Sequence, residues 1–252
     1  MKRVLICSLA SVLATIPIFA ANIPEHKPAQ EQHVQHIQQK GTSEPYKSVT
    51  FEVRAMYDEN RLPFLYADSL AALRERGYQR HPRPAEVFSL YFAGLEGKIA
   101  GEQLTVFKNM AVDKTPVEWL SMAMYRDGDM LYCYEDPTNI KKATEPRMDA
   151  KGNLAEWYAD GILQHSSVRQ FQITGLVGHE YISVNELPTD LVVYLYSREY
   201  KDFPTALKGE NAPLVMFPND GELCPVSRST TWCGIGSYGY LSEASRGVLS
   251  RR

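Results

Sequence analysis

Residues 119–136, WLSMAMYRDGDMLYCYED, carry the pattern that decides the fold prediction. Two runs rich in aromatic and apolar residues flank Asp127 and Gly128. Asp-Gly is favoured in a two-residue hairpin turn because both positions tolerate positive φ. A competing pattern lies upstream, where Thr115, Pro116 and Glu118 have the spacing of a helix start with a capping box. We favour a β-hairpin over residues 119–136, preceded at most by a single helical turn.

The same pattern recurs downstream. In residues 155–175, Asp160-Gly161 separates two aromatic residues from Ile162 and Leu163, which predicts a second hairpin. Further strands are predicted in three segments: residues 179–184 (HEYISV), 190–200 (DLVVYLYSREY) and 212–217 (APLVMF). Strands joined by tight turns in this way predict an antiparallel sheet.

The part of the chain before residue 115 is different. Residues 49–57 alternate between apolar and polar side chains, which predicts a half-buried strand. Asp68 or Ser69 can cap a short helix that Gly77 ends, and a second helix begins near Pro84. The glycines that follow predict a hinge or loop: Gly94, Gly97 and Gly101. We therefore predict an α+β fold, with an early strand and two short helices packed on a mainly antiparallel sheet of β-hairpins.

The chain begins with MKRVLICSLASVLATIPIFAAN, which has the layout of a secretory signal peptide. Lys2 and Arg3 precede an apolar run that is shorter than the about 20 residues of a membrane span. We expect cleavage after Ala20, which removes residues 1–20. The mature protein is then expected to be bacterial, to lie in the periplasm or outside the cell, and to have no transmembrane segment.

Residues 21–47 are rich in Gln, His and Pro and nearly free of large apolar side chains. Such a segment buries too little surface to offset its ordering entropy, so we predict a disordered linker. Its histidines, His26, His33 and His36, fit either a metal-binding tail or a solvated linker, and we favour the linker. The remainder, residues 48–252, is predicted to form a single α+β globular domain. No cofactor is predicted.

The charge balance argues against a nucleic-acid partner. The chain has 27 basic and 30 acidic residues and a formal net charge of −3, whereas nucleic-acid binding needs a concentrated basic surface. The C-terminal arginines Arg246, Arg251 and Arg252 are expected to form a solvated tail.

Three cysteines remain after the predicted cleavage: Cys133, Cys224 and Cys233. In an oxidising compartment nearby cysteines usually pair, and turn-prone residues lie between Cys224 and Cys233. We therefore predict a Cys224–Cys233 disulfide, with the two pairings through Cys133 as alternatives. A zinc site is not predicted, because no second Cys or His pair follows at finger-like spacing.

The segment WYADGILQHSSVRQFQITGLVGHEYISV begins at Trp157 and ends at Val184. Its Tyr-x-Asp-Gly motif, later glycines and final aromatic residue resemble one unit of the MORN-type β-hairpin repeats. The resemblance covers this segment alone. It implies a stacked-hairpin sheet that serves mainly as an interaction surface and has no common catalytic activity.

Two functions follow from these observations. The abundance of tyrosine favours an exported module that binds another protein or a cell-envelope component, because Tyr surfaces suit recognition. The alternative is a secreted hydrolase or toxin with a Cys/His site formed by Cys133 and either His165 or His179. Cys133 is expected on a strand, however, where it has the character of a buried and unreactive thiol.

Overall fold

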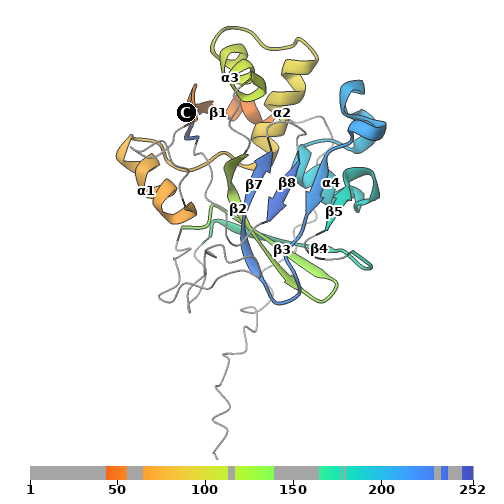
Figure 1. Ribbon diagram of the computed structural model, residues 1–252. Helices are drawn as coiled ribbons and strands as arrows, with labels where there is room; N and C mark the ends of the chain where they lie inside the picture. Colours follow the sequence, from red (N-terminus) through yellow and green to blue (C-terminus); the bar gives the residue numbers. More distant parts are fainter. Residues whose placement is uncertain are drawn as a thin grey trace, which may run out of the picture. The chain divides into compact units, whose positions relative to one another are not determined.

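Seven strands form the larger of two sheets, in the order β4-β3-β2-β7-β8-β6-β5 (Figure 1). The computed structural model describes residues 44–55, 65–112, 117–138, 165–176, 178, 180–229, 234–237 and 246–251, all within the compact unit Lys40–Arg252. Its strands are β2 (Val117–Asp127), β3 (Met130–Glu135), β4 (Ser167–Gln172), β5 (Tyr181–Ser183), β6 (Leu214–Met216), β7 (Leu223–Ser229) and β8 (Ile235–Ser237). β6 and β8 are parallel, and the other neighbours are antiparallel. The smaller sheet pairs β1 (Val49–Phe51) with β9 (Val248–Ser250).

The helices are α1 (Tyr66–Glu75), α2 (Pro84–Leu95), α3 (Gly101–Val112) and α4 (Thr189–Tyr196). Short 3-10 helices complete the described part: η1 (Pro45–Ser48), η2 (Val184–Glu186), η3 (Tyr200–Asp202), η4 (Thr205–Leu207) and η5 (Gly209–Asn211). The α+β class predicted from the sequence, with a mainly antiparallel sheet, is confirmed.

The predicted hairpin of residues 119–136 is formed by β2 and β3. Asp127 pairs with Met130, so the two turn residues are Gly128 and Asp129, one position later than the sequence predicted. Gly128 has φ of +57°, a value that costs glycine little because it has no Cβ. The second predicted hairpin, around Asp160-Gly161, lies outside the described residues.

The prediction of a strand over residues 190–200 is wrong, because α4 occupies Thr189–Tyr196. Its buried side chains are Leu191, Val192, Leu195 and Tyr196. This i, i+1, i+4, i+5 spacing places them on one side of a helix. The prediction of a hinge or loop at Gly94, Gly97 and Gly101 is also wrong in part, because α3 begins at Gly101.

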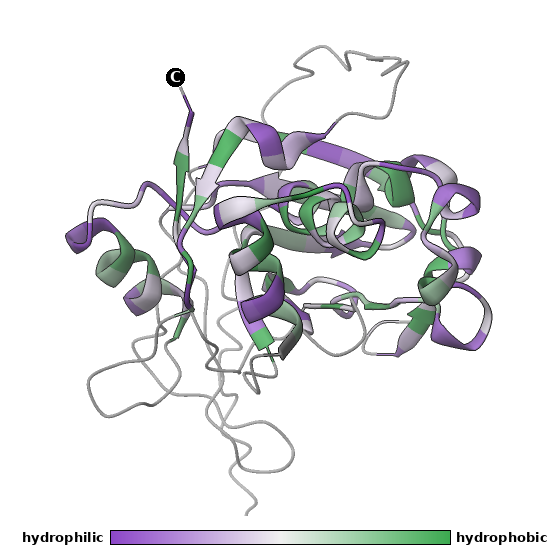
Figure 2. Ribbon diagram, turned by 90° about the horizontal axis from the view of Figure 1, so that it is seen from above, coloured by the Kyte–Doolittle hydropathy of each residue, from purple (hydrophilic) through white to green (hydrophobic). Residues whose placement is uncertain are grey.

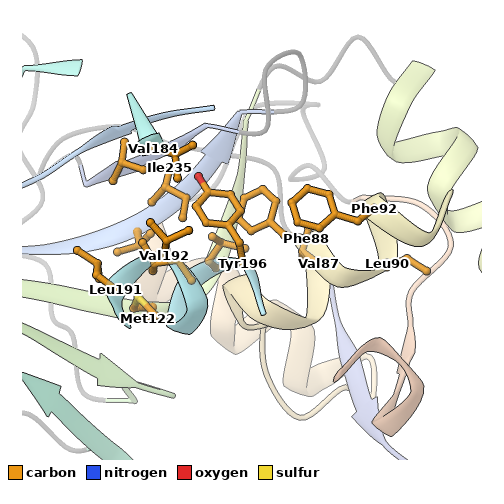
Figure 3. Close-up of a cluster of buried hydrophobic side chains, with 14 of the residues drawn as sticks. Val87, Phe88, Leu90, Phe92, Met122, Val184, Leu191, Val192, Tyr196 and Ile235 are labelled. Carbon is orange, nitrogen blue, oxygen red and sulfur yellow. The ribbon is translucent and has the colours of Figure 1, made fainter. Parts of the chain in front are cut away.

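The main core lies between the sheet and the helices α2 and α4 (Figure 3). Phe88 of α2 and Tyr196 of α4 have ring centroids 4.5 Å apart, and Phe92 follows one turn later on the same side of α2. Hydrophobic and hydrophilic residues alternate along the helical ribbons in Figure 2, as expected for helices with one buried side. Met122 and Met124 of β2 belong to this core.

The opposite face of β2 contributes to a second, smaller apolar cluster. Trp119 and Ala123 are buried there together with Tyr66 of α1, and the rings of Tyr66 and Trp119 are 5.4 Å apart in an edge-to-face arrangement. Adjacent residues of β2 thus serve opposite faces of the sheet, as strand geometry requires. We call the side of α2 and α4 the inner face and the side of Ala123 the outer face.

A buried ionic cluster joins the C-terminal part of the chain to the sheet. We call Glu118, Arg228 and Arg246 the Glu118 cluster. Arg246 Nη2 donates to Glu118 Oε1 at 2.9 Å, while Arg246 Nη1 donates to the carbonyl oxygens of Glu52 and Val53 at 2.6 and 2.8 Å. The expectation of a solvated tail is wrong for Arg246, which is fully buried. Its burial depends on Glu118, which is far away in the sequence.

Candidate binding surface at the outer edge of the sheet

Strand β4 ends the seven-stranded sheet on one side, next to β3 in the lower part of Figure 1. Among the described residues, β3 is its only strand partner. Four of its side chains are exposed: Val168, Arg169, Gln170 and Gln172. Val168 keeps 41% of its surface exposed, a large value for an aliphatic side chain in a strand. Edge strands of this kind present backbone groups to which another chain can pair.

The direction of the backbone groups of β4 follows from the register. The Ile173 N–H donates to the carbonyl of Asp129 at 2.8 Å, so odd-numbered residues of this segment point at β3. A hydrogen bond between β3 and β2 supports the same assignment. The Asp136 N–H donates to the Ser121 carbonyl at 3.1 Å, so the backbone N–H and C=O groups of even-numbered residues of β3 point at β2. The odd-numbered ones therefore point at β4, where Cys133 pairs with Arg169. It follows that the N–H and C=O groups of Val168, Gln170 and Gln172 point away from the sheet. We call these three residues, with Arg169, the β4 edge.

Aromatic side chains line the outer face beside the β4 edge. Tyr134 lies opposite Val168, and Tyr132 lies opposite Gln170. The ring of Tyr132 is 5.9 Å from that of Tyr125, and the ring of Tyr134 is 5.0 Å from that of His165. Burial raises the pKa of both Tyr125 and Tyr134 above the usual value of a tyrosine. The result is a row of half-buried tyrosines next to a strand that has no second strand partner among the described residues.

On the inner face, Arg169 lies above the ring of Tyr194, with its guanidinium carbon 5.3 Å from the ring centroid. The hydroxyl of Tyr194 donates to Glu135 Oε1 at 3.0 Å, and Ser167 Oγ donates to Glu135 Oε2 at 2.8 Å. Arg83 lies 3.4 Å from Glu135 Oε2 as well. The carboxylate is therefore occupied by other groups, and no described acidic side chain forms an ion pair with Arg169.

A denser group of charges lies where β3 ends. Arg80 makes a bidentate pair with Glu86 at 2.7 and 2.8 Å, and Arg83 pairs with Asp136. Burial alone would raise the pKa of Asp136, but the hydrogen bond from Arg83 and the charge of Arg80 hold it below its usual value. Asp136 has φ of +49°. These charges neutralise one another, so we assign them to holding α2 against the end of β3.

A small pocket of about 110 Å³ adjoins this group. It is lined by Leu70, Arg74, Gln79, Arg80, Ser121, Asp136, Pro137 and Thr138. Arg80 already uses its donors on Glu86 and on the carbonyl of His81. The exposed side chains of the lining are Arg74, Gln79 and Thr138, and Gln79 Oε1 already accepts hydrogen bonds from Ser250. We regard the β4 edge as the stronger candidate for binding.

The residues of the predicted Cys/His site lie as follows. Cys133 is fully buried on the inner face, and burial raises the pKa of its thiol well above the usual range. His165 is exposed and contacts Tyr134, whose side chain points to the opposite face of β3. The structure therefore does not bring Cys133 and His165 together, and His179 lies outside the described residues.

A serine–histidine pair that the sequence did not suggest is present at α1. Ser69 Oγ lies 2.9 Å from Nε2 of His81, and both side chains are fully buried. The serine hydroxyl donates to the carbonyl of Tyr66 at 2.7 Å, so the proton between serine and histidine belongs to Nε2. His81 thus does not act as a base toward Ser69, and the pair fixes the position of α1.

The two described cysteines, Cys133 and Cys224, are both buried and form no disulfide with each other. Met124 of β2 pairs with Cys133 on one side and with Cys224 on the other. Two strand spacings, about 9.5 Å, separate them, whereas a disulfide needs Cα atoms within about 7 Å. A Cys133–Cys224 bond is therefore excluded in this fold. Cys233 lies outside the described residues, so the Cys224–Cys233 bond stays a prediction.

Several other predictions fall wholly or mostly on residues that the structure does not describe. These are the signal peptide, the linker with His26, His33 and His36, and much of the segment that resembles a MORN-type repeat. Within the described ranges, no cluster of three or more His, Cys, Asp or Glu side chains is placed to hold a metal ion. None of the described helices has the length and apolar character needed to cross a bilayer.

The sequence could have indicated β4 by one feature. In SVRQFQ, Phe171 is the one apolar residue on its face of the strand, because Ser167 and Arg169 occupy the other two positions on that face. A strand with polar residues on both faces is typical of a sheet edge.

No known protein-family model matches the chain, and comparisons with curated proteins and with solved structures find no match.

Proposed function

We propose that the protein is an exported bacterial binding module that uses the β4 edge and the adjoining tyrosines to hold another protein or a component of the cell envelope. The observation that carries this proposal is that β4, beside Val168 and Tyr134, has no second strand partner among the described residues. Export is inferred from the leader, residues 1–20.

Physical reasoning supports a binding role for this edge. Natural sheets usually protect their edges with proline, bulges, inward-pointing charges or a covering segment. Strand β4 contains no proline, pairs with β3 in unbroken register, and directs an aliphatic side chain to solvent, although it carries one charge on the inner face, Arg169. Tyrosine rings next to it bury much area at a small cost in side-chain entropy, as is common in recognition surfaces.

The experiment measures retention of the full chain by separate envelope fractions: membranes, peptidoglycan sacculi and soluble periplasmic proteins immobilised on beads. Val168→Lys is compared with Leu95→Lys on α2, since the two side chains are 41% and 39% exposed and receive the same charge. We expect one fraction to retain the wild type and Leu95→Lys equally, and Val168→Lys at least tenfold less.

Two results contradict the proposal. One is the absence of retention by every fraction. The other is an equal loss of retention for Val168→Lys and Leu95→Lys, which would show that the added charge weakens retention wherever on the surface it lies. Export is tested separately by the N-terminal residue of the mature chain, which we expect to be Ala21.

A further inference from the structure

Building on the proposed binding function, we infer that the β4 edge accepts an extended polypeptide segment as an additional strand, and that this segment carries a carboxylate opposite Arg169. The backbone groups of Val168, Gln170 and Gln172 all point to the same side, away from β3. Alternate residues of a strand are about 6.8 Å apart, which is the repeat of the backbone groups of any extended chain. A folded surface rarely offers this repeat, whereas an extended segment always does.

The side chains of the β4 edge define what the added segment must contain. Residues directly opposite one another in neighbouring strands project to the same face, with Cβ atoms about 4.5–5.5 Å apart. The residue opposite Val168 therefore lies on the outer face near Tyr134 and should be apolar. Its neighbour in the segment lies on the inner face, opposite Arg169.

Contacts within the protein hold the side chain of Arg169 on the inner face, where that residue of the added segment would lie. Its guanidinium rests on the ring of Tyr194, and Tyr194 is fixed by its bond to Glu135. Because Glu135 is taken by Tyr194 and Ser167, Arg169 has no acidic partner among the described side chains. A glutamate or aspartate of the added segment would provide one, through a charge-assisted hydrogen bond.

The same charge argues against a second copy of this chain as the occupant. In an antiparallel pair of two β4 strands, hydrogen bonding through Gln170 would place Arg169 opposite Phe171 of the other copy. The two Arg169 side chains would then lie diagonally on one face, about 7–8 Å apart, without an acidic group between them. A segment of another protein that carries a carboxylate would give Arg169 an acidic partner, whereas pairing between two β4 strands would not.

The test uses synthetic octapeptides of alternating valine and threonine with glutamate, glutamine or lysine at one central threonine position. Their affinity for the full chain is measured by fluorescence anisotropy. We expect the glutamate peptide to bind at least fivefold more tightly than the lysine peptide, and Arg169→Glu to reverse this order. Arg251→Glu, a charge reversal on another exposed arginine, should leave the order unchanged.

A second variant tests the strand pairing itself. Gln170→Pro removes an N–H that points outward and leaves the bonds to β3 in place, a position where edge strands tolerate proline. We expect it to weaken all three peptides at least tenfold. Arg169→Glu keeps the backbone intact, so the charge test remains decisive even if Gln170→Pro does not fold.

Amide hydrogen exchange reports whether the edge is open. The amides of Val168, Gln170 and Gln172 should exchange fast in the free protein and slow down when the glutamate peptide is added. Protection of these amides in the free protein would overturn the inference, as would equal affinity for the three peptides. Sedimentation that shows a dimer lost in Gln170→Pro, without peptide binding, would assign the edge to a second copy and also overturn it. If peptides fail but envelope retention still depends on Val168, the inference fails while the proposed function stands.

Discussion

Glu118 and Arg169 are both charged residues of the seven-stranded sheet, but they lie in opposite kinds of surroundings. Glu118 is fully buried between Arg228, whose Nη2 is 2.9 Å from its Oε2, and Arg246, whose Nη2 donates to its Oε1. Arg169 lies at the surface of an edge strand, with an aromatic ring on one side and no ion pair to a described residue. One charge is enclosed and compensated, and the other is accessible and uncompensated.

The difference separates a charge whose loss would destabilise the fold from a charge whose loss would not. Burial would raise the pKa of Glu118, but the charges of Arg228 and Arg246 outweigh burial and lower the pKa to about 2. Loss of Glu118, the carboxylate that both buried guanidiniums contact, would therefore leave charge uncompensated in a dry interior. At the β4 edge, water replaces a missing partner at little cost, so the side chains there are free to be used by a ligand.

The largest expected effect comes from removing the enclosed carboxylate. Glu118→Gln keeps the shape of the side chain but removes the carboxylate that both buried guanidiniums contact. We expect the free energy of unfolding to fall by about 3–5 kcal/mol, measured by urea denaturation. Glu102→Gln on α3, where the side chain is exposed, serves as the control and should change it by less than about 0.5 kcal/mol. A loss below about 1 kcal/mol for Glu118→Gln would contradict the structural role of the cluster.

A second buried polar group, His81, sharpens the comparison because its burial favours the neutral form of the side chain. Desolvation, followed by the charges of Arg80 and Arg74, lowers the pKa of His81 to about 3. In the unfolded chain the pKa is about 6.5, so the unfolded state binds more protons between these values. The stability contributed by neutral His81 is therefore complete above pH 6.5 and is lost as the pH falls from 6.5 toward 3.

The measurement compares the wild type with His81→Gln between pH 6.5 and 4.5, and the titration of Glu118, which both proteins contain, cancels in the difference. We expect the difference in unfolding free energy between the two proteins to shift by about 2 kcal/mol over this interval, against the wild type at low pH. The amide of glutamine can still donate to Ser69 Oγ, which preserves the local hydrogen bond. A difference that does not depend on pH would show that His81 is accessible to protons in the folded state.

Local patterns in the sequence were sufficient for several elements. The turn at Gly128 and the helix that begins at Pro84 depend on the conformational preferences of glycine and proline, which act within a few residues. The run that contains Val192 and Val193 misled because β-branched residues favour strands, while the burial of Leu191 and Leu195 on one side favours a helix. A short apolar run does not distinguish these two possibilities.

The burial of Arg246 and the place of β4 in the sheet both depend on residues that are far apart in the sequence. Arg246 is buried because Glu118 lies beside it, and more than a hundred residues separate them in the chain. Among the described strands, β4 lies at the end of the sheet, and that order cannot be read from the composition of SVRQFQ. Sequence patterns thus predict which residues form strands more readily than which strand is left without a neighbour.

The smallest expected effect on stability is that of Val168→Lys, and it separates the two regions most clearly. If the β4 edge is open in the free protein, lysine at this position meets water and contributes a charge that natural edge strands often carry. The free energy of unfolding should then change by less than about 0.5 kcal/mol in urea denaturation, although binding falls at least tenfold in the retention experiment. A loss above about 1 kcal/mol would mean that the side chain packs against another part of the folded chain. The edge would then be closed, and Val168 would resemble Glu118 more than Arg169.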